Sequence, residues 1–338
     1  MINQTSSLEF SHFPVMLSEV LKISSPSNGG SFIDCTFGGG NYSREILKFS
    51  QTKVQALDRD KKVKSLAEDL KKQFPKRFNF FQVKFSELDN ILNDNDKVDV
   101  ILFDLGLSSI QLNDLDRGFS FKSDKKLDMS MGLNDTSAFE VINNLSEQNL
   151  KSIIKILGEE KEASIIAKNI VKNRNIKKIS NTGELVKIIE KSKKKNFLNK
   201  INPCTKTFQA LRIFVNKEVT ELIDGIIGAT KKLKPGGKIL VVSFHSIEDR
   251  IVKYFFTNFS QNKSRPSRYL PENKFSNKAL FIEYKNKLFR PSKQEIIKNS
   301  RSRSAKLRFA IRSKNKFEYP SDFKKKFKKY LDIEAINA

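Results

Sequence analysis

The sequence has no tryptophan, two cysteines and two histidines, and none of its apolar runs approaches the roughly 18 to 20 residues that a membrane span needs. Cys35 and Cys204 lie far apart and form no CxxC pair, so neither a disulfide framework nor a zinc site is predicted. The start, MINQTSSLEF, lacks the basic and apolar segments of a secretory signal. We therefore expect a cytoplasmic protein that contacts no membrane and binds no metal.

An excess of positive charge is the most prominent feature that the sequence does have. Lysine and arginine total 63 against 38 acidic residues in a chain of 338, which gives a formal net charge of +25. A polyanion such as RNA is therefore the first partner to consider. The same excess also fits a biased genome, because the chain is rich in lysine, asparagine, isoleucine and phenylalanine together. Both interpretations stay open at this point.

Strand and helix patterns alternate in the first third of the chain. Apolar runs predict strands at residues 31–37, 53–58, 78–85 and 98–106. Between the second and third of them, Val63, Leu66, Leu70 and Phe74 recur at the spacing of an amphipathic helix. Strands that alternate with such helices predict right-handed βαβ units, and hence an α/β, Rossmann-like fold built on a parallel sheet.

This alternation is interrupted after Gly106 by helical patterns, which predict an all-helical insert over residues 113–206. The sheet domain is therefore expected to be discontinuous, comprising residues 1–112 and 207–315. Its second part predicts a long helix at 208–233, a tight turn at 235–237, a buried strand at 238–244, a helix at 248–259, and two closing strands at 281–284 and 305–312. A basic tail at 316–338 is expected to be a short helix or disordered.

The stretch FIDCTFGGGNYSRE, residues 32–45, combines a strand, a glycine-rich turn and the start of a helix. In an open parallel sheet, ligands bind beyond the carboxyl ends of the strands, where the strand order reverses. Gly38, Gly39 and Gly40 let the backbone pass close to such a ligand. Asp58 ends the second strand 18 residues after Gly40, at a position where an acid commonly accepts both hydroxyls of a ribose.

Two ligand classes share this arrangement. A dinucleotide needs a third glycine, and Ser43 stands at that position instead. S-adenosylmethionine has no phosphate; it needs a glycine-lined gap, an acid for the ribose and a further polar group, which Asp58, Asp104 and the segment DLGLSSIQL can supply. The alternative is that Asp58 and Asp104 merely cap the helices that follow them.

A set of segments in order from residue 12 to about residue 312 resembles the ribosomal RNA small subunit methyltransferase H (MraW) family. The segments are HFPVMLSEVL, FIDCTFGGG, ALDRD, LFDLGLSS with Gln111, DRGFSF, LDMSM, TKTFQALRIFVNKE, LKPGGKILVVSFHSIEDRIVK and SRSRSAKLR. The resemblance implies an S-adenosylmethionine-dependent enzyme that methylates N4 of a cytidine in the decoding region (P site) of 16S rRNA, in the small ribosomal subunit. It also implies that the helical insert helps to recognise this substrate.

The resemblance also implies a set of cofactor contacts. They fall on Gly40, Asn41, Tyr42, Asp58, Phe85, Asp104 and Gln111. Two positions depart from the usual family pattern: Asn41-Tyr42 replaces Gly-His, and Ser130 replaces an arginine. Because asparagine tolerates a positive φ better than most residues, we expect the turn to survive the first change.

The target nitrogen is a poor nucleophile because its lone pair is delocalised into the ring. A site must hold it in line with the methyl group and accept a hydrogen bond from its N–H. Asp104 is the expected acceptor, with cofactor binding as a second role that does not exclude the first. Phe119 and Phe121 are our hypothesis for a platform on which the base stacks; the alternative is that both belong to the core.

His245 follows the expected strand at 238–244 and is a candidate for substrate contact, whereas His12 is a weaker one. Arg301, Arg303 and Arg308, the lysine-rich part of the insert and the tail are expected to contact RNA, because guanidinium groups bind phosphate with two hydrogen bonds. A nicotinamide-dependent oxidoreductase and an RNA-binding protein without catalysis remain the rival functions. Whether the chain forms a homodimer is left open.

Overall fold

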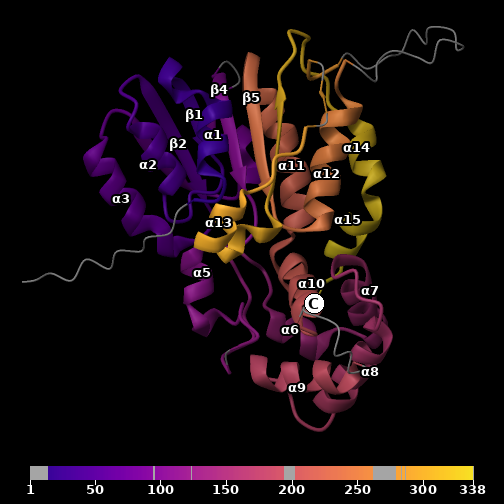
Figure 1. Cartoon of the computed structure of the whole chain (residues 1–338). Helices are drawn as coiled ribbons and strands as arrows, with labels where there is room; N and C mark the ends of the chain where they lie inside the picture. Colours follow the sequence, from indigo (N-terminus) through magenta and orange to yellow (C-terminus); the bar gives the residue numbers. More distant parts are fainter. Residues whose placement is uncertain are drawn as a thin grey trace, which may run out of the picture.

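The computed structural model describes residues 14–93, 96–122, 124–193, 202–261, 279–282, 284–285 and 287–337. Figure 1 shows a sheet with helices on both of its faces, and a second group of helices below it. None of the helices in the described ranges is both long and apolar enough to cross a bilayer.

Six strands form one sheet in the order β3-β2-β1-β4-β5-β6. They are β1 (Gly30–Asp34), β2 (Thr52–Asp58), β3 (Phe78–Gln82), β4 (Val98–Asp104), β5 (Leu233–Ser243) and β6 (Lys306–Ile311). Strands β1 to β5 are parallel, and β6 runs antiparallel to β5. The strand order reverses between β1 and β4, where this type of sheet binds its ligands. The predicted α/β, Rossmann-like fold is confirmed.

Alternate residues of the central strands face two hydrophobic cores. Val100 and Leu102 of β4 pack in one core with α1 (Leu17–Ser24), α2 (Asn41–Leu47) and α3 (Lys64–Gln73). Ile101 and Phe103 pack in the other with α11 (Glu218–Lys232) and α12 (Ser246–Asn258). Burial of each such side chain stabilises the fold by about 1.5–3 kcal/mol. A strand covered on both faces is therefore apolar throughout, which is why β4 gave a continuous apolar run.

The long helix predicted over 208–233 is wrong, because two helices meet there. α10 (Thr205–Asn216) ends and α11 begins on either side of Lys217, which has a left-handed φ of 49°. The side chain of Asn216 explains the break: its Nδ2 donates to the carbonyl of Met129 at 2.8 Å, and its Oδ1 accepts from the N–H of Met131 at 2.8 Å. These tertiary hydrogen bonds override a helical pattern that continues across the break.

Two other local predictions also differ from the structure. The turn at 235–237 is a bulge inside β5, since Val98 of β4 pairs with Leu233 and Val100 pairs with Lys238. A strand at 281–284 is wrong: Phe281 forms only isolated bridges in the described part of this segment. Its ring packs 5.5 Å from Phe255 and 5.3 Å from Phe256 of α12, so the apolar pattern reflects the core.

Between β4 and β5, the described residues form helices and no strand of the sheet. The helices are α5 (Ser109–Asn113), α6 (Ala138–Asn144), α7 (Glu147–Leu157), α8 (Ala163–Arg174), α9 (Thr182–Ser192) and α10. Ser137, Ser146 and Asn181 start α6, α7 and α9 by accepting a hydrogen bond from the N–H three residues later. The bounds of the helical insert, residues 113–206, stay our prediction. Helix α10 packs on α6 and α7 of the helical group but also leads directly into α11 of the sheet body, so it belongs to both parts.

Several hydrogen bonds join the helical group to the sheet body. On one side, Arg59 donates from Nε to the carbonyl of Gly132 at 2.7 Å and from Nη1 to that of Asn216 at 2.9 Å. On the other side, Arg250 of α12 donates to Oε1 of Glu159 at 2.7 Å. Together with a hydrophobic core that is continuous between the two parts, these contacts fix the insert below the carboxyl edge of the sheet.

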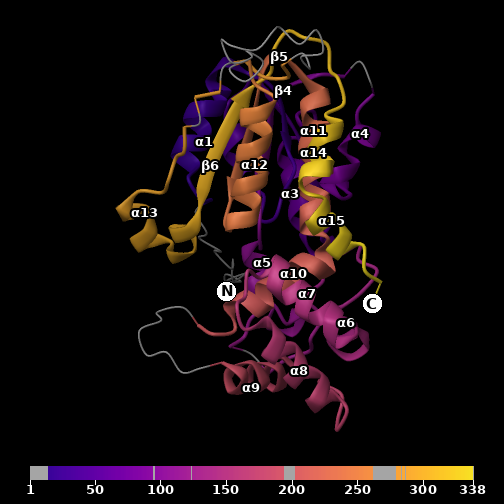
Figure 2. The ribbon, with the colours of Figure 1, turned by 90° about the vertical axis from the view of Figure 1, so that its right-hand side faces the viewer.

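The chain ends in two short helices, α14 (Ser321–Lys326) and α15 (Lys328–Glu334), where we expected a short helix or disorder. Figure 2 shows them lying along α11. Phe323, Phe327 and Tyr330 are buried, and the Phe323 ring lies 4.6 Å from that of Phe255. The carboxylate of Glu334 accepts the N–H groups of Val219 and Thr220 at 2.9 and 2.8 Å, and so caps the start of α11.

Candidate functional site

The glycine turn after β1 is held in a single conformation. Gly38 and Gly40 have positive φ angles of 50° and 73°. A Cβ at Gly40 would lie 2.6 Å from the ring of Phe37, so only glycine fits there. Asp34, buried below the turn, accepts the N–H of Thr36 at 3.2 Å and the hydroxyl of Ser43 at 2.7 Å. Burial raises the pKa of Asp34 to about 6.

Asp58 lies beside this turn at the end of β2. Its Oδ2 accepts the N–H of Gly38 at 2.7 Å, and its Oδ1 accepts the N–H of Asp60 at 2.8 Å. Burial raises the pKa of Asp58 to about 6, although both hydrogen bonds favour the ionised form. Each oxygen of the carboxylate keeps a lone pair for a further donor, as a ribose diol would supply.

Asp104 ends β4 directly across the point where the strand order reverses. Its backbone N–H donates to the hydroxyl of Thr36 at 2.7 Å, which joins the end of β4 to the turn after β1. Its Oδ1 is buried and has no hydrogen-bond partner within the described residues. Burial, with added repulsion from Asp34 and Glu248, raises the pKa of Asp104 well above its usual range. Such an orphaned acceptor calls for a ligand or a cation.

The structure gives Gln111 and Tyr42 partners inside the protein. Gln111 and Ser108 form a capping box at the start of α5, and Gln111 Nε2 also donates to Asp60 at 3.1 Å. The hydroxyl of Tyr42 donates to the carbonyl of Val15. The phenol is buried, and burial with added repulsion from Asp104 and Asp34 raises the pKa of Tyr42 well above its usual range.

Phe85 and Asn41 each begin a short element that follows a strand or the glycine turn. Phe85 begins the turn η3 (Phe85–Glu87) and packs edge-on against Phe103 with ring centroids 5.4 Å apart. Asn41 is the first residue of α2 and has no positive φ. The tolerance of asparagine for a positive φ is therefore not used at this position, because Gly40 supplies the left-handed conformation of the turn.

Phe119 and Phe121 both pack against the core. Phe119 is 8% exposed and lies under the guanidinium of Arg117, which is 5.4 Å from the ring centroid. Phe121 is half-buried and meets Phe208 of α10 edge-on, with centroids 5.9 Å apart. These contacts favour the alternative interpretation, in which both are core residues.

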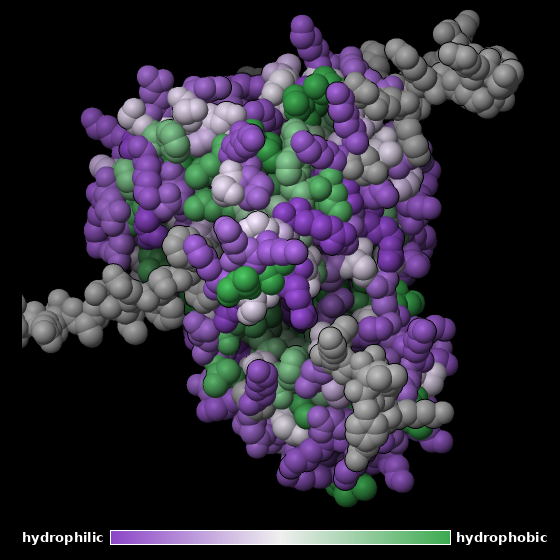
Figure 3. All heavy atoms as spheres, viewed as in Figure 1, coloured by the Kyte–Doolittle hydropathy of each residue, from purple (hydrophilic) through white to green (hydrophobic). Residues whose placement is uncertain are grey.

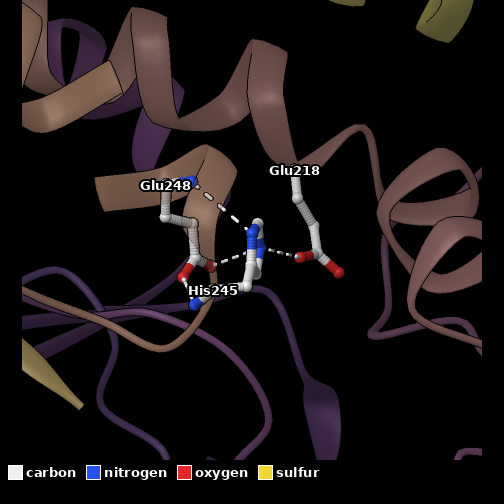
Figure 4. Close-up of side chains that lie close together, drawn as sticks. All are labelled: Glu218, His245 and Glu248. Carbon is white, nitrogen blue, oxygen red and sulfur yellow. Dashed lines mark hydrogen bonds and ion pairs between the residues drawn. The ribbon is translucent and has the colours of Figure 1, made fainter. Parts of the chain in front are cut away.

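His245 follows β5 and belongs to a cluster with Glu218 and Glu248, which Figure 4 shows in close-up. It caps α12 by accepting the N–H of Glu248 on Nδ1 at 3.5 Å, and its Nε2 lies 3.1 Å from Oε1 of Glu248. Burial opposes ionisation of Glu248, but its interaction with His245 and the charge of Arg212 hold its pKa below the usual value. Arg212 also pairs with Glu218 through two bonds of 2.8 Å. His12 lies outside the described residues.

The three arginines expected to contact RNA differ in placement. Arg308 is buried and paired with Asp249 at 2.7 Å, so its predicted role in RNA binding is wrong. Arg301 is exposed but donates to Ser109 at 3.1 Å, and so joins the turn η5 (Ser300–Ser304) to α5. Arg303 is exposed on the same turn. The lysine-rich stretch of the insert lies mostly outside the described residues.

Figure 3 shows that hydrophilic side chains cover most of this face and that a hollow opens below α13 (Lys293–Lys298), between the sheet body and the insert. Asp60 and Arg117, which form a buried ion pair nearby, were missed from the sequence. Both stand inside segments that carried the resemblance, ALDRD and DRGFSF, but no pattern in the sequence pairs residues so far apart.

Comparisons with known proteins agree on one family. Residues 9–313 match the model of the MraW methylase family. A protein of Ehrlichia canis (strain Jake) named ribosomal RNA small subunit methyltransferase H is 43% identical over 304 residues, which cover 89% of this chain and 99% of that protein. A protein of the same name from Ehrlichia ruminantium (strain Welgevonden) is 44% identical over 306 residues, which cover 89% of this chain and 99% of that protein. Another from Bartonella grahamii (strain as4aup) is 43% identical over 302 residues, which cover 89% of this chain and 90% of that protein.

Proposed function

This chain belongs to the MraW methylase family, and we propose on that basis that it transfers a methyl group from S-adenosylmethionine to N4 of a cytidine in the decoding region of 16S rRNA. The observation that carries the proposal within the molecule is the orphaned, buried Oδ1 of Asp104, beside the glycine turn and close to the switch point of the sheet. An unpaired acid at that place suits a cationic sulfonium ligand and an amino-group substrate.

The residues around the crevice fit S-adenosylmethionine. When bound, it supplies an activated methyl group on a positively charged sulfur. Asp58 would accept its ribose hydroxyls, and glycine at position 40 lets the turn take its left-handed conformation against the ring of Phe37. Because the Tyr42 phenol is turned toward Val15, we propose that Gly40, Asn41 and Tyr42 contribute through their backbone.

Phe85 and Gln111 are the proposed contacts on the adenine side. Phe85 stands at the end of the β3 segment, and its edge-on contact with Phe103 anchors its ring. Gln111 would have to divide its amide between the cofactor and Asp60, to which it already donates at 3.1 Å. We keep both residues as proposed cofactor contacts.

Asp104 is the proposed acceptor for the N4–H of the target cytosine. Accepting that hydrogen bond returns electron density to the nitrogen and holds it in the orientation that attack requires. The carboxyl must be ionised to do so, and its pKa is raised by burial, Asp34 and Glu248. The positive charge of a bound S-adenosylmethionine would lower that pKa again. The carboxylate would therefore be ionised when the cofactor is bound, which is when it must accept the hydrogen bond.

The oxidoreductase alternative is disfavoured by one contact. Ser43 stands where a dinucleotide site would need its third glycine, and its hydroxyl is buried and bonded to Asp34 at 2.7 Å. Arg303, the lysines of the insert and those of the C-terminal helices are proposed to contact rRNA in the small subunit, and Phe119 and Phe121 are kept only as contributors to the shape of the hollow.

A direct test is nucleoside mass spectrometry. Small subunits from cells that lack the gene are incubated with purified protein and S-adenosylmethionine, and their rRNA is digested. We expect N4-methylcytidine with the wild-type protein and with the exposed-surface control Asp69→Asn, and none with Asp104→Ala. Methylation on another atom, or none with the wild type, would contradict the proposal. Efficient methylation by Asp104→Ala would contradict the role of that residue alone.

A further inference from the structure

The carboxylate of Asp60 is a junction between three separate segments of the chain. Its Oδ1 accepts the N–H of Lys62 at 3.1 Å, which starts the turn η2 (Lys61–Val63) after β2. Its Oδ2 accepts Gln111 Nε2 from α5 at 3.1 Å, and also accepts Nη1 of Arg117. The side chain of Asp60 is 2% exposed, so these three contacts form without competition from water.

Arg117 extends this junction into the first loop of the insert. It ends the turn η4 (Leu115–Arg117), and its Nη2 donates to the carbonyl of Ser130 at 2.6 Å. The flat face of its guanidinium covers the ring of Phe119. One buried cation therefore holds both ends of the segment 117–130. Its own position is set by the ion pair with Asp60, which follows β2.

The same junction reaches the proposed cofactor acid through the backbone. The N–H of Asp60 donates to Oδ1 of Asp58 at 2.8 Å. The backbone of Asp60 therefore contacts the proposed cofactor acid, while its side chain contacts Arg117. A shift of Arg117 would change the position of segment 117–130 relative to Asp58 without touching Asp58 itself. Asp58 would keep its second hydrogen bond, from Gly38.

We propose that Arg117 is a positioning residue for methyl transfer, and that its ion pair with Asp60 sets segment 117–130 of the insert against the cofactor crevice. This inference rests on the proposed function, and it gives Arg117 no contact with substrate or cofactor. The segment includes Phe119 and leads to Met131, which is tied in turn to Asn216 at the start of the α10–α11 break. The hollow between the sheet and the insert thus takes its shape partly from one ion pair.

Stability alone is a poor explanation for this pair. Buried ion pairs pay a large desolvation cost and can often be replaced by apolar residues of similar size without loss of stability, whereas removal of one partner leaves an uncompensated charge. If the pair only stabilises the fold, neutralising both residues should restore both stability and the transfer rate. If the pair positions segment 117–130, the same double substitution should restore stability but not the transfer rate. That difference can be measured.

The test compares Arg117→Met, Asp60→Asn and the double variant Asp60→Asn/Arg117→Met in the full-length protein. Thermal unfolding measures stability, calorimetry measures the Kd for S-adenosylmethionine, and single-turnover methylation of small subunits measures the transfer rate. We expect Arg117→Met to lower Tm and the double variant to recover most of that loss. We expect the transfer rate to fall by about tenfold or more in Arg117→Met and in the double variant, because small misplacements of reacting groups slow a reaction by that factor. The Kd should change less than about threefold in both of these variants.

Lys72→Met provides a matched control, because it also breaks a cation–carboxylate pair, with Asp69, but at an exposed site. All three measurements should stay at wild-type values in it. Recovery of the transfer rate together with Tm in the double variant would reduce Arg117 to a structural residue and overturn the inference, as would a loss confined to the Kd. No N4-methylcytidine from the wild type would instead contradict the proposed function.

Discussion

The backbone N–H of Gly38 donates a hydrogen bond of 2.7 Å to Oδ2 of Asp58. This bond joins the glycine turn after β1 to the end of β2, so the acid and the turn are placed relative to each other before any ligand arrives. It also shows why the two features are needed together. The turn exposes an N–H that holds the carboxylate, and the carboxylate holds the turn open.

Affinity for S-adenosylmethionine should fall in acid. The pKa of Asp58 is raised by burial to about 6, and only the ionised carboxylate accepts both ribose hydroxyls. We expect the Kd to be nearly constant above pH 7 and to rise by up to tenfold for each pH unit below 6. Calorimetry between pH 5 and 8 measures this. Asp58→Asn should bind weakly at every pH, and any slope that it retains would belong to Asp34 or Asp104, whose pKa values are also raised by burial.

Asp104 should control the transfer rate more than cofactor binding. Removal of the acceptor in Asp104→Ala is expected to slow single-turnover methylation by about 100-fold or more, the size typical of a lost acid–base group. Asp104→Asn keeps an amide oxygen and should retain part of the rate. Because the pKa of Asp104 is raised by burial and by neighbouring acids, the wild-type rate should increase with pH. If the rate of the Asp104→Asn variant increased with pH in the same way as that of the wild type, the pH dependence would belong to another group.

Glycine is required at position 40 but not at position 228. Ala at 40 must adopt a φ of 73° and place its Cβ 2.6 Å from the Phe37 ring, so Gly40→Ala should abolish detectable binding of S-adenosylmethionine and lower Tm. A Cβ at Gly228, in the middle of α11, meets nothing within 4 Å. Gly228→Ala should therefore be neutral or stabilise by about 0.4–1 kcal/mol. Equal effects of the two substitutions in thermal unfolding would contradict this account of the turn.

Glu334 should make stability depend on pH. Burial raises its pKa from 4.5 to about 7. Between these values the unfolded chain has released the proton while the folded chain keeps it, so this contribution is complete below pH 4.5 and is lost as pH rises through 7. In urea unfolding, the free energy of wild type relative to Glu334→Gln should decrease from pH 5 to pH 8, by at most about 3 kcal/mol. A constant difference would mean that Glu334 is already ionised at pH 5.

Binding to small subunits should weaken steeply as salt rises. Exposed arginines and lysines that neutralise phosphates release counterions, and each such contact adds to the slope of log K against log salt. Arg303→Ala should reduce that slope by about one. Filter binding at several salt concentrations measures both values. A flat response in the wild type would mean that the net charge of +25 reflects genome composition instead of a partner.

The difference between successful and failed predictions follows the range of the interactions involved. The strands up to Asp104 and the glycine turn were predictable, because apolar runs and glycine clusters reflect burial and backbone freedom within a few residues. The break at Lys217 was not, since it depends on hydrogen bonds from Asn216 to Met129 and Met131, more than 80 positions away in the chain. The strand at Phe281 was wrongly predicted for a related reason: a core aromatic residue and a strand residue have the same local pattern.

The candidate site divides in the same way. By itself, the sequence determined the sheet class, the acids at the ends of β2 and β4, and the family, because each depends on residue types at short, ordered spacings. Only the tertiary structure decided that Oδ1 of Asp104 has no hydrogen-bond partner among the described residues and that Tyr42 donates to Val15. It also decided that Arg308 is buried and that Asp60 meets Arg117. These facts depend on desolvation and on contacts between distant segments, which exist only once the chain has packed.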